Sequence, residues 1–345
     1  MNVKLSSIAA LAVLFTACSK IDLSPKADEL QKAKVDQLSL SVAKSKLAPE
    51  PINFTAPFVF PEGVVYDPLN NRFLVSSIAM GTVGAVNYQG VYSPFIQDAD
   101  LASTVGMEID NVRQRLLVTN TTIEGTLAQL AIYDLRSGTR LFLIDLAAVA
   151  NDGAPHLVND VTIDQQGNAY VTDSYAGIIY KVDRFGNATV FYQNTAFTPA
   201  PGLFGFNGIE YSNTRQGYLL VAHADLGQII KIPVDNPASF TTVQLNAPIP
   251  SPDGLLLSKD SKQLIVVSNT GDLPGSKVLS LISNDNWASA NNNGDFSTGV
   301  VFPTTVASDG KTLYVLYSYI HLLLGGQARE IFTIQPLPFD NKHPF

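Results

Sequence analysis

The sequence predicts an all-β fold, and within that class a six-bladed β-propeller with four-stranded blades. Apolar residues make up 46 % of the 345 residues and charged residues only 15 %, while Gly and Pro number 24 and 20. This composition is typical of many short buried strands joined by tight turns. In addition, a sequence motif recurs six times at a nearly constant spacing. It consists of a short turn, a strand of alternating apolar residues, a polar turn and a second apolar strand.

The six copies of this motif begin near residues 61, 105, 159, 207, 252 and 303. They lie roughly 45 to 55 residues apart, which is the period expected when each repeat is one four-stranded blade. A β-sandwich also uses many short strands, but it does not require a sequence motif that repeats at this period. The segment "INFTAPFV" precedes the first copy, and we expect it to add a strand to the sixth blade and so to close the ring.

The N-terminal part of the chain has the features of an export signal. Residues 1–17 combine Lys4, the apolar run "IAALAVLF" and small residues before Cys18, as in a signal peptide. The stretch "LFTAC" resembles the lipobox of bacterial lipoproteins, which implies that Cys18 becomes the lipidated first residue; an ordinary secretory signal is the alternative. We therefore expect a lipid-anchored protein of the bacterial cell envelope, with a polar tether over residues 18–53 and the propeller over residues 54–345.

Charge and cysteine content exclude several functions. The formal net charge is −8 and the chain has no run of Lys and Arg, so a nucleic acid partner is not expected, and contact with a membrane is expected only through the lipid anchor. Cys18 is the only cysteine, which excludes an intramolecular disulfide and a thiolate metal cluster within one chain. The sequence also lacks a G-x-S-x-G motif and a P-loop, which argues against serine hydrolase chemistry and nucleotide binding.

Polar side chains recur where the innermost strand of each blade begins. Because these strands line the central channel, the residues at their starts are expected to meet at one end of it. We call the residues at equivalent positions of the six repeats a column. The column at the strand starts contains Glu62, Val105 or Gly106, Asn159 with Asp160, Asn207, Asp253, and Phe302 or Pro303. Carboxylates that converge in a narrow opening need a compensating cation, and an all-oxygen ligand set favours Ca²⁺, Mg²⁺ or Mn²⁺ over a zinc site. The alternative is that "PEG", "NG" and "PDG" simply form tight turns.

The same motifs carry a family resemblance. The segments "PEGVVYD", "NDVTIDQQGNAYVTD", "NGIEYS" and "PDGLLLS" resemble the motifs at the blade starts of the SMP-30/gluconolactonase/LRE-like family of six-bladed propellers, over most of residues 60–335. The resemblance implies that Glu62, Asn207 and Asp253 hold one divalent cation, with Ca²⁺ expected first and Mg²⁺, Mn²⁺ or Zn²⁺ as alternatives. It also implies that Asn159 contacts the substrate or a metal-bound water, and that Asp253 acts as the catalytic base, with Asp160 as the second choice.

This resemblance leads to two hypotheses about function. The first is a metal-dependent hydrolase that opens a lactone or another small ester with activated water. The second is a non-catalytic propeller lipoprotein that binds a ligand or a protein and keeps a structural metal. Sugar lactonases of the family often carry an Arg shortly before the "ND" motif, where this chain has Leu157 and Val158, so an aldonolactone is not the expected substrate. A histidine base, His156 or His223, is the remaining alternative for catalysis.

Overall fold

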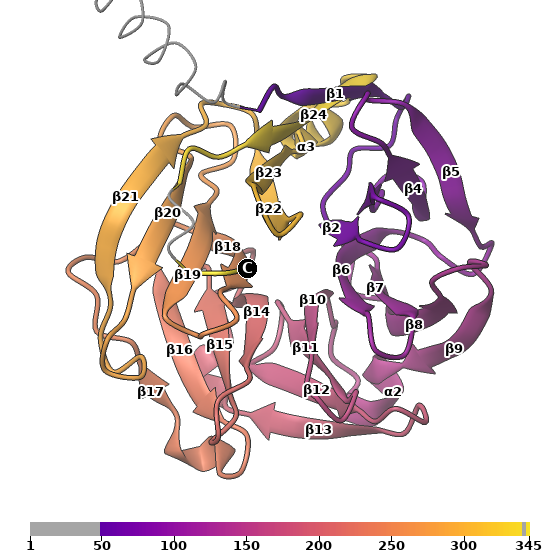
Figure 1. The fold of residues 1–345 in the computed structure, drawn as a ribbon. Helices are drawn as coiled ribbons and strands as arrows, with labels where there is room; N and C mark the ends of the chain where they lie inside the picture. Colours follow the sequence, from indigo (N-terminus) through magenta and orange to yellow (C-terminus); the bar gives the residue numbers. More distant parts are fainter. Residues whose placement is uncertain (1–48, 340–342) are drawn as a thin grey trace, which may run out of the picture. The chain divides into compact units, whose positions relative to one another are not determined.

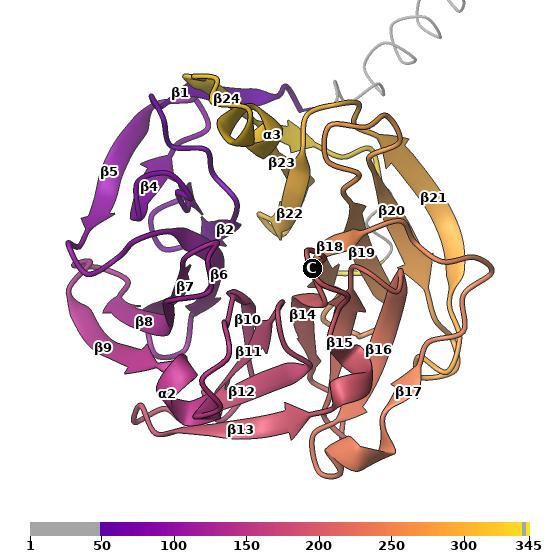
Figure 2. The ribbon, with the colours of Figure 1, turned by 180° about the vertical axis from the view of Figure 1, so that it is seen from behind.

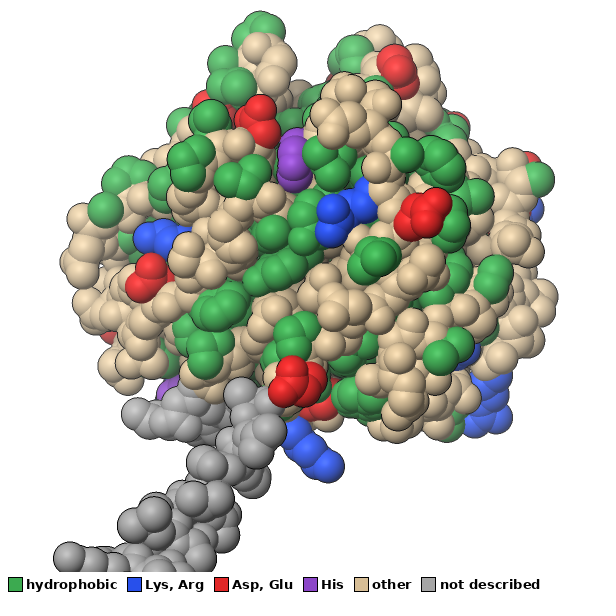
Figure 3. All heavy atoms as spheres, turned by 90° about the horizontal axis from the view of Figure 1, so that it is seen from above, with side chains coloured by type: hydrophobic (Ala, Val, Ile, Leu, Met, Phe, Trp, Pro, Cys, Tyr) green, Lys and Arg blue, Asp and Glu red, His purple; other side chains and the backbone are tan. Residues whose placement is uncertain are grey.

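Six antiparallel sheets of four strands each surround a central axis in the computed structural model (Figures 1 and 2). The structure describes residues 49–339 and 343–345, so the predicted signal peptide, Cys18 and the tether up to residue 48 lie outside the described residues. The predicted all-β, six-bladed propeller with four-stranded blades is confirmed. Seen from the side of the ring, hydrophobic side chains occur in small groups among polar ones, and charged side chains are few (Figure 3).

The first three blades follow one another along the chain, each from its inner to its outer strand. Blade 1 consists of β2 (Val64–Asp67), β3 (Arg72–Val75), β4 (Thr82–Val86) and β5 (Tyr92–Gln97). Blade 2 consists of β6 (Thr104–Asp110), β7 (Arg115–Thr121), β8 (Ala128–Asp134) and β9 (Arg140–Asp145). Blade 3 consists of β10 (Val158–Ile163), β11 (Ala169–Asp173), β12 (Ile178–Val182) and β13 (Ala188–Gln193).

The next two blades repeat this order, and the sixth combines both ends of the described chain. Blade 4 consists of β14 (Phe206–Ser212), β15 (Tyr218–His223), β16 (Gln228–Pro233) and β17 (Thr241–Thr242). Blade 5 consists of β18 (Pro252–Leu257), β19 (Gln263–Ser268), β20 (Lys277–Ile282) and β21 (Asn291–Ser297). Blade 6 consists of β22 (Pro303–Ser308), β23 (Leu313–Tyr317), β24 (Ile331–Pro336) and β1 (Ile52–Thr55).

The helices of the described part are short and lie in connections between strands. They are α2 (Leu146–Ala150), α3 (Ile320–Leu324) and the 3₁₀ turns η1 (Thr195–Phe197) and η2 (Pro237–Ser239). None of the described helices is long and apolar enough to cross a membrane.

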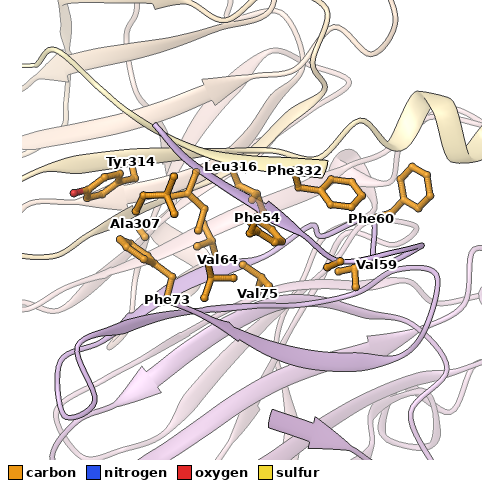
Figure 4. Packing of buried hydrophobic residues seen from close by; sticks show 14 residues of the cluster. Phe54, Val59, Phe60, Val64, Phe73, Val75, Ala307, Tyr314, Leu316 and Phe332 are labelled. Atoms are coloured by element: carbon orange, nitrogen blue, oxygen red, sulfur yellow. The ribbon is translucent and has the colours of Figure 1, made fainter. Parts of the chain in front are cut away.

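Strand β1 closes the ring as the sequence predicts. It pairs antiparallel with β24, from Ile52 opposite Ile334 to Thr55 opposite Ile331, and it crosses the expected boundary between residues 53 and 54. Behind this pair, Phe54 lies with its ring centre 5.9 Å from that of Phe332, in a buried cluster with residues from strands of blades 1 and 6 (Figure 4). Burial of aromatic rings on both sides of the junction makes the closure a continuous part of the core.

Most inner strands begin with a β-bulge, which sets the direction of the residues at the channel. In blades 2 to 6 the register between the first and second strands shifts by one residue near the strand start, because two residues of the first strand lie opposite one residue of the second. The residues within these shifts are Val105–Gly106, Asn159–Asp160, Asn207–Gly208, Asp253–Gly254 and Thr304–Thr305. A bulge re-aims side chains and twists the strand. The position equivalent to Asp253 in blade 6 is therefore Thr304, and the sequence-based choice of Phe302 or Pro303 was wrong.

The turn interpretation of the "NG" and "PDG" motifs is also wrong. Asn207 and Gly208 lie inside β14, and Asp253 and Gly254 lie inside β18. A Cβ atom on Gly208 would lie 2.3 Å from the main-chain oxygen of Asp253, and one on Gly254 would lie 2.5 Å from that of Thr304. These glycines are needed because each inner strand passes very close to the next one, and not because a turn requires positive φ.

Candidate functional site

Four predicted side chains lie at equivalent positions where the inner strands begin. Glu62 precedes β2, and Asn159, Asn207 and Asp253 belong to the bulges of β10, β14 and β18. All four are almost completely buried, with exposed fractions of 7 to 9 %. We call the end of the propeller at which the inner strands begin the site face. The structure therefore places oxygen-bearing side chains from four blades around this end of the channel.

The amide groups of the site have defined orientations. The hydroxyl of Ser174 donates to the main-chain oxygen of Phe206 at 2.6 Å, so it can only accept from Nδ2 of Asn159, at 3.0 Å. This leaves Oδ1 of Asn159 free of that pair. Similarly, Oδ1 of Asn269 accepts from the main-chain N–H of Gly271 at 3.0 Å, so its Nδ2 donates to Oδ2 of Asp253 at 2.9 Å.

Two buried oxygens of the site have no hydrogen-bond partner among the described residues. They are Oε2 of Glu62 and Oδ1 of Asn207. The main chain of Glu62 is held firmly, because its N–H donates to Ser76 Oγ and its carbonyl accepts from Thr304 Oγ1 at 2.6 Å. Leaving a buried oxygen unsatisfied costs about 1 to 3 kcal/mol, and more for a charged group. These two atoms are therefore available to a bound cation or to a hydrogen-bond donor.

The carboxyl groups of the site raise one another's pKa. Burial, together with the charges of Asp253 and Asp160, raises the pKa of Glu62 well above its usual value. Burial also raises the pKa of Asp253 to about 7, against hydrogen bonds from Asn269 and Asn207 that lower it. No cluster of three or more His, Cys, Asp or Glu side chains suited to a metal ion occurs within residues 49–339 and 343–345. The set instead combines two carboxylates with two amides, all hard oxygen donors.

Asp160 joins two blades. Its Oδ1 accepts from the N–H of Val161 at 2.9 Å, and its Oδ2 accepts from the N–H of Ile209 in blade 4 at 3.1 Å. Burial raises its pKa to about 7 despite these two donors. Both oxygens of Asp160 are thus committed to the main chain, whereas Asp253 keeps an oxygen free of Asn269.

A cavity of about 360 Å³ continues along the channel beyond Asp160. Its lining includes Glu108 and Glu210, and also Lys259 and Phe345. Burial raises the pKa of Glu108 to about 8 and that of Glu210 well above the usual value. The N–H of Lys259 donates to the carbonyl of Pro344 at 2.7 Å, which holds the C-terminal residues in the centre of the ring (Figure 1). Neither Glu108 nor Glu210 was predicted from the sequence as a site residue.

The two histidines considered as bases are held on both ring nitrogens. His156 contacts Oδ2 of Asp173 at 2.6 Å through Nδ1 and Oδ1 of Asp152 at 3.0 Å through Nε2. His223 contacts the carbonyl of Phe197 through Nε2 at 2.9 Å, and its Nδ1 accepts from the N–H of Leu226. Neither ring has a nitrogen left for a substrate, so these residues are structural in this arrangement.

Replacement of His156 by Gln is expected to destabilise the protein by about 2 kcal/mol at pH 6 and by less at pH 9.5. The hydrogen bond to Asp173 raises the pKa of His156, so the protonated ring contributes its full stability below about pH 6.5, and this contribution is lost as the pH rises through the folded-state value. The other polar groups that face the His156 ring are Tyr180, which also donates to Asp173, and Asp152. The pKa of Asp152 is lowered, so its carboxylate stays ionised between pH 6 and pH 9.5. Urea unfolding of both proteins at several pH values measures the difference.

The control for this measurement is His223→Gln. Burial lowers the pKa of His223, so its neutral ring contributes stability above its unfolded pKa, and that contribution is lost as the pH falls. A destabilisation by His156→Gln that does not change with pH would contradict the charged pairing.

Two residues that orient the amide and carboxyl groups of the site, Ser174 and Asn269, were not predicted from the sequence. Ser174 and Asn269 lie at equivalent positions of blades 3 and 5, three residues after Val171 and Val266 of the second strands. A signal was present in the sequence, because the second apolar strand of the repeated motif is followed by polar residues in these copies. Reading this second column beside the first would have identified both.

Comparison with known proteins adds information about the fold. No family model matches the sequence, and neither does any curated protein. The chain is similar in structure to the allergen Mala s 1 of Malassezia sympodialis, with a TM-score of 0.68 and 17% identity over 86% of this chain and 97% of that chain.

Two enzymes of bacteria are also similar in structure. For a gluconolactonase from Xanthomonas campestris, the TM-score is 0.57 and the identity 14%, over 83% of this chain and 88% of that chain. For virginiamycin B lyase from Staphylococcus aureus, the TM-score is 0.56 and the identity 12%, over 84% of this chain and 89% of that chain. An allergen, a lactonase and a lyase are all similar to this chain in structure, so the likeness supports the β-propeller fold and does not indicate an activity.

Proposed function

We propose that the protein is a metal-dependent hydrolase that acts on a lactone or another small ester. The observation that carries this proposal is the pair of buried, unpartnered oxygens of Glu62 and Asn207 beside the carboxylate of Asp253. The similarity of the strand-start motifs to those of the SMP-30/gluconolactonase/LRE-like family, and of the fold to a gluconolactonase, supports the same reaction class.

The donor set fits a hard divalent cation. Glu62, Asn207 and Asp253 would hold it through side-chain oxygens, with Asn159 beside it, and Ca²⁺ is the first expectation, ahead of Mg²⁺, Mn²⁺ and Zn²⁺. When bound, such an ion polarises an ester carbonyl and lowers the pKa of water.

The residues of the chain supply the proton transfer and the positioning. Asp253, held by Asn269 on Oδ2, would accept the proton of the attacking water as the oxygen of that water bonds to the acyl carbon. The bond from the acyl carbon to the ring oxygen then breaks, and the proton passes to the departing oxygen. Asn159, oriented by Ser174, would position the substrate or the water with its free Oδ1. Asp160 is the second choice as base.

A bound divalent cation is expected to raise the melting temperature of the full chain by about 5 °C at 100 times its dissociation constant. The shift should vanish in Glu62→Gln, which removes the charge with little change of shape, and should persist in Glu124→Gln, an exposed carboxyl group on the same face. Thermal unfolding after chelation, with Ca²⁺, Mg²⁺, Mn²⁺ or Zn²⁺ added back, measures both. The same samples are then assayed against lactones and aryl esters.

The outcomes separate the two hypotheses. A melting shift with metal-dependent turnover supports the hydrolase. A shift without turnover on any lactone or ester supports the binding propeller with a structural metal. The absence of both a shift and turnover would overturn the proposed metal site. The lipid anchor at Cys18 is a separate proposal, and incorporation of labelled fatty acid into the full chain but not into Cys18→Ala tests it.

A further inference from the structure

The loops of the site face carry a series of exposed apolar side chains, which we call the apolar rim. In five of the six blades, the loop between the second and third strands exposes one large apolar side chain, with exposed fractions from 41 to 72 %. These residues are Met80, Ile123, Leu226, Leu273 and Leu324. In blade 3 the corresponding loop contains Tyr175, whose ring is stacked at 5.9 Å on that of Phe204, which is 40 % exposed.

The rim lies beside the residues of the site because of the strand order. Each inner strand leaves the site face and the second strand returns to it, so the loop that follows lies next to the starts of the inner strands. Main-chain hydrogen bonds confirm this arrangement: the loop of Ser174 meets Gly205 before β14, and the loop of Gly227 meets Ile249 before β18. On the opposite face, the loops expose a large apolar side chain in three blades only, at Leu69, Val91, Val112 and Phe185.

The charge of the site face is unfavourable for an anionic substrate. In the described loops of this face, Arg329 is the one Lys or Arg side chain, and its guanidinium lies 3.3 Å above the ring of Tyr319. The site itself contributes the carboxyl groups of Glu62, Asp160 and Asp253. A substrate bearing a carboxylate or phosphate would therefore meet carboxylates and little positive charge, whereas a neutral molecule with an alkyl chain would meet apolar side chains on its way to the site.

We propose that the substrate is a neutral lactone or ester with an alkyl chain, and that this chain lies on the apolar rim while the ester group reaches Asp253. The inference rests on the proposed hydrolase function and specifies its substrate class. Removal of apolar surface from water increases transition-state binding for each methylene that the rim covers, by about fourfold in kcat/KM. The increase should end when the chain extends past the rim.

A series of γ-lactones tests this inference, with ring substituents from none to eight carbons and one lactone that carries a carboxylate. In the presence of the activating metal, kcat/KM should rise about fourfold per methylene over the first carbons, and the anionic lactone should be the poorest substrate. Leu273→Ser and Leu324→Ser should lower kcat/KM for the lactone with the longest chain at least threefold and leave kcat/KM for the unsubstituted lactone unchanged. Val112→Ser, on the opposite face, is the matched control.

The result separates the inference from the proposed function. Turnover that does not depend on chain length, in the wild type and in Leu273→Ser, overturns the inference and leaves the hydrolase in place. If no lactone is hydrolysed with any metal, the hydrolase proposal fails. Binding of the neutral apolar dye Nile red then tests whether the apolar rim recognises apolar molecules. Weaker binding in Leu273→Ser and Leu324→Ser, but not in Val112→Ser, supports apolar recognition at the rim; equal binding in all proteins overturns it.

Discussion

Replacement of Asp253 by Asn is expected to lower metal-dependent lactone hydrolysis about 1,000-fold. Asn keeps the shape of the side chain and can still accept from Asn269, but it removes the negative charge and the group that would take the proton from water. Steady-state kinetics with saturating metal measures the loss. Circular dichroism and thermal unfolding show whether the variant retains the fold, which is expected because the hydrogen bond to Asn269 can persist.

Asp160→Asn is the comparison for this variant. Because both oxygens of Asp160 accept main-chain hydrogen bonds, from Val161 and Ile209, this change should act mainly on stability, by about 1 kcal/mol, and less than tenfold on the rate. If Asp253→Asn keeps its rate within threefold and Asp160→Asn does not, the role of base belongs to Asp160.

Replacement of Gly208 by Ala is expected to destabilise the propeller by about 3 kcal/mol, although it adds a single methyl group. The new Cβ would lie 2.3 Å from the main-chain oxygen of Asp253 and 2.9 Å from the main-chain nitrogen of Leu255. Both are backbone atoms of a buried strand, so the strain can be relieved only by moving β14 and β18 apart. Since Asn207 and Asp253 belong to these two strands, metal affinity should fall together with stability.

The control for this effect is Gly325→Ala. At Gly325 the nearest atom to an added Cβ is the carbonyl of His321 at 3.3 Å, and φ is negative, so this change should cost less than about 1 kcal/mol. Urea unfolding of both variants provides the comparison. Equal stability of the two variants would show that the blades are not held as closely as the distance at Gly208 indicates.

The fold was predictable because its signal is repeated six times. A motif that recurs at a period of roughly 45 to 55 residues identifies blades even when the assignment of single strands is ambiguous. The column of Glu62, Asn159, Asn207 and Asp253 followed from the same repeat. In blade 6 the prediction selected Phe302 or Pro303, whereas the position equivalent to Asp253 is Thr304. Blade 6 has Thr305 where blades 4 and 5 have Gly208 and Gly254, so the glycine that marks this position in those two blades is missing.

Other features depend on contacts between blades and could not be read from one strand. The need for glycine at position 208 arises from the main chain of Asp253 in the next blade, and the hydrogen bond from Ile209 to Asp160 joins residues of different repeats. The orientations of Asn159 and Asn269 likewise require knowing which partner each amide nitrogen reaches. The residues of a site are therefore easier to predict than the hydrogen bonds that direct them.

The pairing of β1 with β24 also has a consequence for how the protein is made. The first strand of the propeller emerges from the ribosome long before its partner, so it must wait while five blades are synthesised, and the sixth blade can form only when Ile331–Pro336 has appeared. Until then, β1 lacks its partner strand and the unclosed ring leaves strand edges open to other chains. A truncated or stalled chain that lacks either strand would thus keep an unpaired edge and be prone to aggregation, whereas a chain that contains both strands can close the ring.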